Sequence, residues 1–201
     1  MESKGFFIVI EGIDGSGKTI QSKRLVRWLN NKGFKSRYTK EPTDGPIGKI
    51  LKKMIRKRNV DVRVEALLFA ADRLEHLNRE VIPYIQKGYI VVSDRYVYSS
   101  LAYQSVTTGD SEWIEEINKF AFRPDLAILL DVEPRIGLSR IRKRRARFEE
   151  EKFLEKVRER YLEIAVRERL KIVYASRSIG EVFQEIVQIV GKSQRFRGNS
   201  I

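Results

Sequence analysis

The sequence reads Gly12-Ile13-Asp14-Gly15-Ser16-Gly17-Lys18-Thr19 one residue after the apolar run Phe6 to Ile10 and just before a stretch of helical periodicity. This is the Gly-x-x-x-x-Gly-Lys-Thr spacing of a phosphate-binding loop, in the strand-loop-helix setting that such a loop requires. Glycines let the loop turn so that successive backbone N–H groups converge on a phosphate, and the following helix adds the positive end of its dipole. We therefore expect all eight residues, from Gly12 to Thr19, to bind ATP.

Side chains in and beyond this loop suit the charge of a bound triphosphate. Lys18 offers a mobile cation to the β- and γ-phosphate oxygens, and Thr19 offers a hydroxyl to Mg²⁺, which prefers oxygen ligands. Two apolar runs end in an acid, Asp94 and Asp131, and either could face the metal. Because Arg95 follows Asp94, and because loops beyond strand carboxyl ends form the ligand crevice of an open α/β sheet, we favour Asp94. We expect Asp94 to hold Mg²⁺ through water and Asp131 to start the next helix.

Outward from the loop, short apolar runs alternate with longer stretches of helical periodicity. This alternation predicts an α/β fold with a parallel sheet flanked by helices. Four runs look fully buried, namely Phe6 to Ile10, Tyr89 to Val92, Leu126 to Leu130 and Leu170 to Tyr174. A fifth run, Ser36 to Thr39, is shorter and polar, which suits a strand at the edge of the sheet. Helices are expected over residues 20–32, 47–55, 66–85 with a kink or end at Pro83, 111–120, 134–145, around 153–164, and 179–190.

Composition limits the class of protein. The chain has 201 residues, 42% of them hydrophobic, so we expect a single domain over residues 1–201 with one buried core. It has no cysteine and no apolar run of eighteen residues, so we expect a cytoplasmic protein without a membrane span. The net charge of +13 indicates anionic partners. The polar, basic tail 191–201 is expected to be disordered.

Further motifs follow in a fixed order, and with the loop they resemble the thymidylate kinase family from Phe6 to about Val187. They are Glu41-Pro42, Leu67-Leu68-Phe69-Ala70-Ala71-Asp72-Arg73, Asp94-Arg95-Tyr96, Ser99-Ser100-Leu101-Ala102-Tyr103-Gln104, and Pro124-Asp125-Leu126 leading to Leu130-Asp131-Val132. The resemblance implies a P-loop NTPase three-layer sandwich, a five-stranded parallel sheet in the order 2-3-1-4-5, and a homodimer. It also implies transfer of the γ-phosphate of Mg·ATP to dTMP.

The resemblance further implies roles at the acceptor site. Asp14 would contact the sugar 3′-hydroxyl, and Arg95 would bind the acceptor phosphate through its planar fork. Phe69 would stack on the pyrimidine, whereas its residue type alone favours a place in the core. Arg73 would donate to the base carbonyl, and Tyr103 would exclude a 2′-hydroxyl. The remaining expected acceptor contacts are Pro42, Ser99, Ser100 and Gln104.

Three positions depart from the family pattern. Ser100 stands where some relatives carry an amide side chain, which leaves base discrimination by that residue open. Lys40 stands where an arginine is common, and Thr43 replaces a usual glycine.

A run of cations at Arg142, Lys143, Arg144, Arg145 and Arg147 has two interpretations. Such runs are commonly solvated faces. The resemblance instead implies a short basic lid over residues 142–150 that closes over ATP. Arg147 is our choice for its catalytic cation, beside Lys18, Arg95 and Asp14, with Arg144 next and binding ATP. Arg140 is expected to flank the adenine, and Arg177 could approach it.

Other P-loop proteins remain as alternatives. A GTP-binding switch would need a guanine-reading Asn-Lys-x-Asp, which this chain lacks. A nucleic-acid-stimulated ATPase would suit the charge, but no recognised nucleic-acid module is present, so we expect no nucleic-acid partner. The nearest alternative is a kinase of broader specificity for deoxynucleoside monophosphates.

Overall fold

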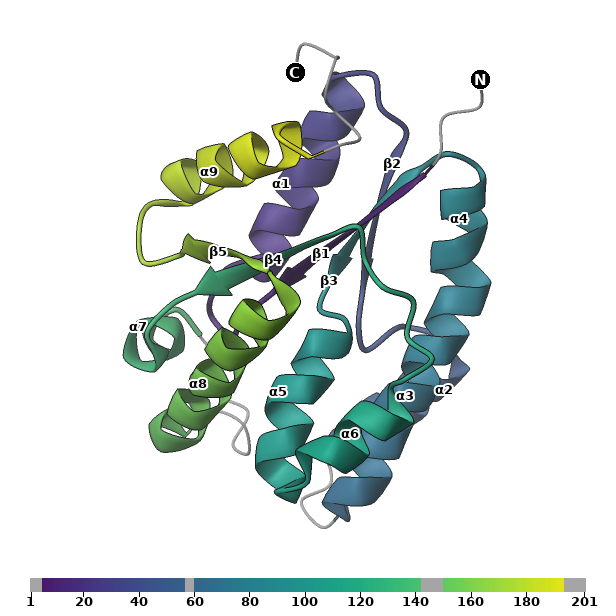
Figure 1. Ribbon diagram of the computed structural model, residues 1–201, viewed down its shortest axis with the longest axis vertical. Helices are drawn as coiled ribbons and strands as arrows, with labels where there is room; N and C mark the ends of the chain where they lie inside the picture. Colours follow the sequence, from purple (N-terminus) through teal and green to yellow (C-terminus); the bar gives the residue numbers. More distant parts are fainter. Residues whose placement is uncertain (1–4, 57–59, 142–149, 194–201) are drawn as a thin grey trace.

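The computed structural model describes residues 5–56, 60–141 and 150–193 of the chain. Its centre is one sheet of five parallel strands in the order β2-β3-β1-β4-β5 (Figure 1). The strands are β1 (Phe6–Glu11), β2 (Ser36–Lys40), β3 (Ile90–Asp94), β4 (Leu126–Asp131) and β5 (Lys171–Tyr174). This sheet confirms the expected α/β fold and strand order, with β2 at an edge as predicted.

Helices cover both faces of the sheet and make the three layers of the fold. α1 and α9 pack together on one face, and α5 and α8 pack together on the other (Figure 1). None of the helices in the described ranges has both the length and the apolar composition needed to cross a bilayer. Their bounds are α1 (Lys18–Asn31), α2 (Pro46–Ile55), α3 (Val62–His76), α4 (Ile82–Gln86), α5 (Val97–Thr108), α6 (Ser111–Ile117), α7 (Pro134–Ser139), α8 (Glu151–Glu168) and α9 (Ile179–Gly191).

The core lies along β1, whose six residues are all buried. β1 pairs with β3 on one side and with β4 on the other, so it is a central strand. A central strand of a parallel sheet is covered by helices on both faces and therefore needs apolar side chains on both. β5 differs from the prediction that it is fully buried. It has a strand neighbour on one side only, and Lys171 and Tyr174 are exposed, so that prediction is wrong.

No helix is predicted from the sequence over Val97–Thr108, where α5 lies. Apolar and polar side chains are buried together along this helix, so it lacks the single apolar stripe that identifies an amphipathic helix. The buried residues are Tyr98, Ser100, Leu101, Ala102, Tyr103, Gln104 and Ser105.

The predicted helix 66–85 is a longer, interrupted element. α3 begins earlier, at Val62, where Asp61 caps it by accepting a backbone N–H at 2.8 Å. A π-helical turn, η1 (Leu77–Val81), then joins α3 to α4. Pro83 lies just after this π-helical turn, so the hydrogen-bond pattern of the helix changes close to the residue that lacks an N–H donor.

The helix after β4, α7, begins at Pro134, as predicted, and not at Asp131. Its N-cap is Glu133, whereas Asp131 is the last residue of β4, so the prediction that Asp131 starts this helix is wrong. Asp131 instead accepts two hydrogen bonds from Arg158 of α8, at 2.7 and 2.8 Å. α7 ends at Ser139, and the predicted lid falls almost wholly on residues 142–149, outside the described residues. Most of the predicted tail, residues 194–201, lies outside them as well.

Candidate nucleotide-binding site

The loop between β1 and α1 has a backbone that only glycine adopts readily. Gly12, Gly15 and Gly17 have φ angles of 141°, 80° and 92°. At Gly15 a Cβ would lie 2.0 Å from the carbonyl oxygen of Gly137, so no side chain fits there. Gly17 is the N-cap of α1, and no side chain caps this helix. The N–H groups that open α1 are therefore available to an anionic ligand, as a phosphate site requires.

Lys18, the first residue of α1, is buried within this loop. Its Nζ donates to the carbonyl oxygen of Ile13 at 2.8 Å. Burial lowers the pKa of Lys18 to about 8; the charge of Arg95 acts in the same direction, and the charges of Asp14 and Asp94 oppose it. A negative ligand beside Nζ would favour the ammonium form, so phosphate binding and protonation of Lys18 support each other.

Thr19 and Asp94 bring two oxygen ligands together from α1 and the end of β3. The Thr19 hydroxyl donates to the Asp94 carboxylate, and the Tyr38 hydroxyl donates to the same oxygen at 3.4 Å. No group of three His, Cys, Asp or Glu side chains in the described part of the chain could hold a metal by itself. Mg²⁺ commonly combines one or two protein oxygens with nucleotide and water oxygens, which fits this pair. Asp131, the other candidate, is held by Arg158.

A crevice of about 660 Å³ extends from this loop along the carboxyl ends of the strands. Such a position is the usual ligand crevice of an open α/β sheet. The lining includes residues 14–21 of the loop and α1, Lys40 and Glu41 at and after the end of β2, Asp94 at the end of β3 and Arg95 after it, Arg140 after α7, and Ala175, Arg177 and Ser178 before α9.

Two of the expected ATP-side arginines border the crevice. Arg140 donates to the carbonyl oxygen of Ala175 at 2.9 Å, which holds it against the connection between β5 and α9. Arg177 lies in that connection and lines the same crevice. Arg144 and Arg147 lie outside the described residues.

Arg95, directly after β3, faces the phosphate-binding loop. Its Nη2 lies 2.5 Å from Oδ1 of Asp14, and its Nη1 donates to the Ser99 hydroxyl at 3.0 Å. Its guanidinium carbon is 5.0 Å from the centre of the Tyr103 ring, and the Tyr103 hydroxyl accepts the N–H of Asp14 at 3.1 Å. Arg95 also has a φ of 70°, a conformation that is uncommon outside glycine and is found at functional sites. Four expected acceptor-site side chains thus meet in space, those of Asp14, Arg95, Ser99 and Tyr103.

Glu11, the last residue of β1, is a site residue that the sequence analysis misses. Its buried carboxylate accepts hydrogen bonds from the N–H of Tyr96 at 2.8 Å and from the hydroxyls of Ser99 and Tyr161 at 2.7 and 3.0 Å. Burial raises the pKa of Glu11, although these hydrogen bonds and the charge of Arg95 oppose the change. Glu11 therefore holds Ser99, whose hydroxyl oxygen in turn accepts a hydrogen bond from Arg95.

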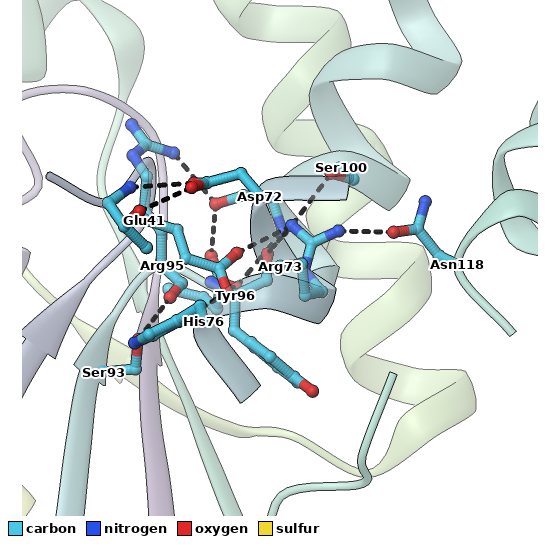
Figure 2. Close-up of polar contacts among 12 residues, drawn as sticks. Glu41, Asp72, Arg73, His76, Ser93, Arg95, Tyr96, Ser100 and Asn118 are labelled. Carbon is cyan, nitrogen blue, oxygen red and sulfur yellow. Dashed lines mark hydrogen bonds and ion pairs between the residues drawn. The ribbon is translucent and has the colours of Figure 1, made fainter. Parts of the chain in front are cut away.

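Arg73 lies at the centre of a buried polar network (Figure 2). Its guanidinium donates to the Ser100 hydroxyl at 3.1 Å, to the carbonyl oxygen of Tyr96 at 3.2 Å, and to the side chain of Asn118. The Nη2 that donates to Ser100 and Tyr96 also pairs with Oε2 of Glu41 at 2.9 Å. The Nε of Arg73 has no hydrogen-bond partner among the described residues. Neither Glu41 nor Asn118 is a site residue in the sequence analysis, because each meets Arg73 only through the tertiary fold.

Among the expected acceptor residues, only Asp14 and Arg95 line the crevice; those that do not are Pro42, Phe69, Arg73, Ser99, Ser100, Tyr103 and Gln104. Phe69 is half-buried and lies outside the hydrophobic core cluster, so the core position favoured by its residue type is wrong. Pro42 is half-buried after β2, and Gln104 is buried in α5. Thr43, at the position of a usual glycine, donates its hydroxyl to Asp72 at 2.5 Å and so ties the segment after β2 to α3.

Comparisons with known proteins show which family the chain resembles. A family model described as thymidylate kinase matches residues 10–186. A probable thymidylate kinase of Pyrococcus horikoshii is 45% identical over 197 residues, covering 93% of this chain and 96% of the relative. A relative of the same description from Staphylothermus marinus is 45% identical over 192 residues, covering 94% of this chain and 96% of the relative. Another from Pyrobaculum aerophilum is 43% identical over 194 residues, covering 95% of this chain and 99% of the relative. The chain therefore belongs to the thymidylate kinase family and is a phosphotransferase of the dTMP kinase class.

Proposed function

We propose that the chain transfers the γ-phosphate of Mg·ATP to dTMP in one crevice, giving dTDP and ADP. A phosphate oxygen of dTMP forms the new bond to the γ-phosphorus as the bond to the β-phosphate oxygen breaks. The observation that carries this proposal is that the phosphate-binding loop and Arg95 line the same crevice. Two anions that must meet are thereby each given a cation, Lys18 for the donor and Arg95 for the acceptor.

On the donor side, the loop and the start of α1 bind the β- and γ-phosphates through backbone N–H groups and Lys18. Thr19 and Asp94 hold Mg²⁺, and we assign the link from Asp94 to a bound water. When bound, Mg²⁺ supplies positive charge to the phosphate oxygens. Arg140 binds near the adenine, which its position against Ala175 supports.

On the acceptor side, Arg95 binds the phosphate of dTMP with its planar guanidinium. Ser99 and the ring of Tyr103 orient this guanidinium, as their contacts with it support. Asp14 accepts from the sugar 3′-hydroxyl, and Tyr103 leaves no room for a 2′-hydroxyl. No strong general base is needed, because the acceptor oxygen is already anionic and positioning supplies most of the catalysis.

For the base, we assign stacking to Phe69 and a hydrogen bond to the ring carbonyl to Arg73. Partial exposure of Phe69 supports its assignment, since a ring sealed in the core could not meet a ligand. The hydrogen bonds and the ion pair of Arg73 support a fixed donor. Pro42, Ser100 and Gln104 complete the acceptor surroundings.

Initial rates with a panel of monophosphates test this function. We expect dTMP to turn over faster than dCMP, dGMP, AMP and GMP at equal concentrations. Faster turnover of AMP or GMP would overturn the assignment of dTMP as acceptor. ATP hydrolysis that rises on addition of single- or double-stranded nucleic acid, with steep salt dependence, would instead favour a nucleic-acid-stimulated ATPase.

We also propose a homodimer formed through α2 and α3. Val64, Leu67 and Leu74 are exposed and recur at helical spacing along α3, and Ile50 of the adjoining α2 is 53% exposed. Such a stripe is costly to leave in water, and a second copy would cover it. Sedimentation should show a dimer that Leu67→Glu converts to a monomer. The control, Val166→Glu on α8, replaces a 79% exposed residue and should stay dimeric. A cytoplasmic location stays a prediction from composition.

A further inference from the structure

His76 is the one histidine of the chain and is fully buried where α3 faces the end of β2. Its Nδ1 lies 3.0 Å from Oε1 of Glu41, and its Nε2 lies 2.6 Å from the Thr39 hydroxyl. A carboxylate paired with an arginine can only accept, so Nδ1 carries the ring proton. Nε2 shares a hydrogen bond with the Thr39 hydroxyl. Both ring nitrogens are therefore used, which fixes the orientation of the imidazole.

Two pairs of residues face each other here. Thr39 and Glu41 are two residues apart at the end of β2 and so point to the same side of the extended chain. Arg73 and His76 are three residues apart on α3 and so share a helix face. The Glu41 carboxylate bridges the two residues of α3, with one oxygen toward His76 and the other toward Arg73 (Figure 2).

We propose that His76 is a positioning residue for the acceptor site, which fixes the Glu41 carboxylate and thereby the Arg73 guanidinium. This inference rests on the proposed function, in which Arg73 donates to the base carbonyl of dTMP. His76 itself does not touch the substrate. It acts by holding the carboxylate that keeps Arg73 from rotating away from the base.

Glu41 needs such support because it lies at the crevice. It lines the crevice on one side and bonds the buried network on the other. Without the imidazole, Arg73 would be its single ion-pair partner among the described residues, and the carboxylate could turn toward the crevice. The Nη2 of Arg73 would then lose its carboxylate contact and keep only its bonds to Ser100 and the carbonyl oxygen of Tyr96, so the guanidinium would be less firmly held.

The preference for dTMP over dCMP measures how well Arg73 is positioned, because dCMP carries an amino group where dTMP carries the base carbonyl that Arg73 is assigned to bind. The ratio of kcat/KM for dTMP to kcat/KM for dCMP is measured on the full chain, together with KM for ATP. His76→Leu keeps much of the volume and removes both hydrogen bonds, so we expect the ratio to fall by about tenfold, as for one lost charge-assisted bond. KM for ATP should not change. His76→Asn retains a donor near the position of Nδ1 and should restore most of the ratio.

An unchanged ratio in His76→Leu would overturn the proposal, as would a fall that His76→Asn does not relieve. If His76→Leu does not fold, judged by circular dichroism, Thr39→Val carries the test. It removes only the hydroxyl that fixes Nε2, and the ratio should fall by roughly threefold and return in Thr39→Ser. No change in Thr39→Val would then overturn the proposal. A wild type that does not prefer dTMP over dCMP would contradict the base assignment of Arg73, which is a separate failure.

Discussion

The guanidinium of Arg95 lies 2.5 Å from the carboxylate of Asp14, across the gap between the end of β3 and the phosphate-binding loop. Both residues are assigned to the acceptor, one to its phosphate and one to its sugar. Their contact therefore keeps a strong cation and an acid paired until dTMP arrives. Because Ser99 and Tyr103 also contact Arg95, this guanidinium can exchange the carboxylate for a phosphate without losing its orientation.

The assignment of Asp14 to the sugar is tested with an acceptor that lacks the 3′-hydroxyl. Wild type should prefer dTMP over 3′-deoxythymidine monophosphate by about 10- to 100-fold, because a hydrogen bond to a charged group is lost. Asp14→Ala should lower kcat/KM for dTMP and remove most of this preference, since the partner of the hydroxyl is gone. Steady-state kinetics with both acceptors at saturating ATP measure the preference. A variant that still discriminates between them would show that another group binds the hydroxyl.

Protonation of Lys18 predicts a pH dependence for ATP. Burial lowers the pKa of Lys18 to about 8, so in the free enzyme the ammonium is lost as pH rises through that value. Because kcat/KM for ATP reports the free enzyme, it should fall by about tenfold per pH unit above pH 8. At saturating ATP the bound phosphates favour the ammonium, so kcat should fall only at higher pH. A level profile of kcat/KM for ATP up to pH 9.5 would contradict this role.

The basic run at residues 142–147 leads to a prediction from sequence alone. Arg147→Ala should slow the chemical step by about a hundredfold or more, which is usual for a transition-state arginine. Arg145→Ala removes the same charge from the same run and serves as the control, with turnover near wild type. Single-turnover kinetics separate the chemical step from product release. Near-normal transfer in Arg147→Ala would remove this residue from the mechanism and direct attention to Arg144.

The sheet and the phosphate-binding loop could be predicted because their signals are local. The apolar run of β1, the glycine spacing and the helix that starts at Lys18 all lie between Phe6 and Asn31. α5 could not be predicted from local signals, because this helix is buried on several sides and shows no single apolar stripe. The burial of β5 was mispredicted because whether a strand lies at an edge depends on the whole sheet.

The site divides in the same way. Lys18 and Thr19 belong to a motif, whereas Arg95 and Arg73 are assigned to the acceptor site only through the resemblance to a known family. Glu11 was missed because its hydrogen-bond partners Ser99 and Tyr161 are 88 and 150 residues away in sequence. A buried acid acquires its role only from the groups that the fold brings to it.

The two acids that end β3 and β4 offer a matched pair for the metal assignment. Asp94 accepts from the Thr19 hydroxyl, whereas Asp131 is bound through two hydrogen bonds to Arg158. Asp94→Asn should raise the Mg²⁺ concentration for half-maximal activity by about tenfold or more, since a ligand to the metal or to its water loses its charge. Asp131→Asn should leave that concentration unchanged.

Thermal unfolding should give the opposite order for these two variants. Asp131→Asn weakens the pair with Arg158 and should lower the free energy of unfolding by about 1 kcal/mol, discounted because the Arg158 side chain is 32% exposed. In a chain of this size that corresponds to a fall of about 2–4 °C in Tm. Asp94→Asn removes a charge beside Lys18 and Thr19 without leaving an arginine unpaired, so its Tm should change less. If instead Asp131→Asn altered the Mg²⁺ dependence and Asp94→Asn did not, the metal would have to be reassigned to the end of β4.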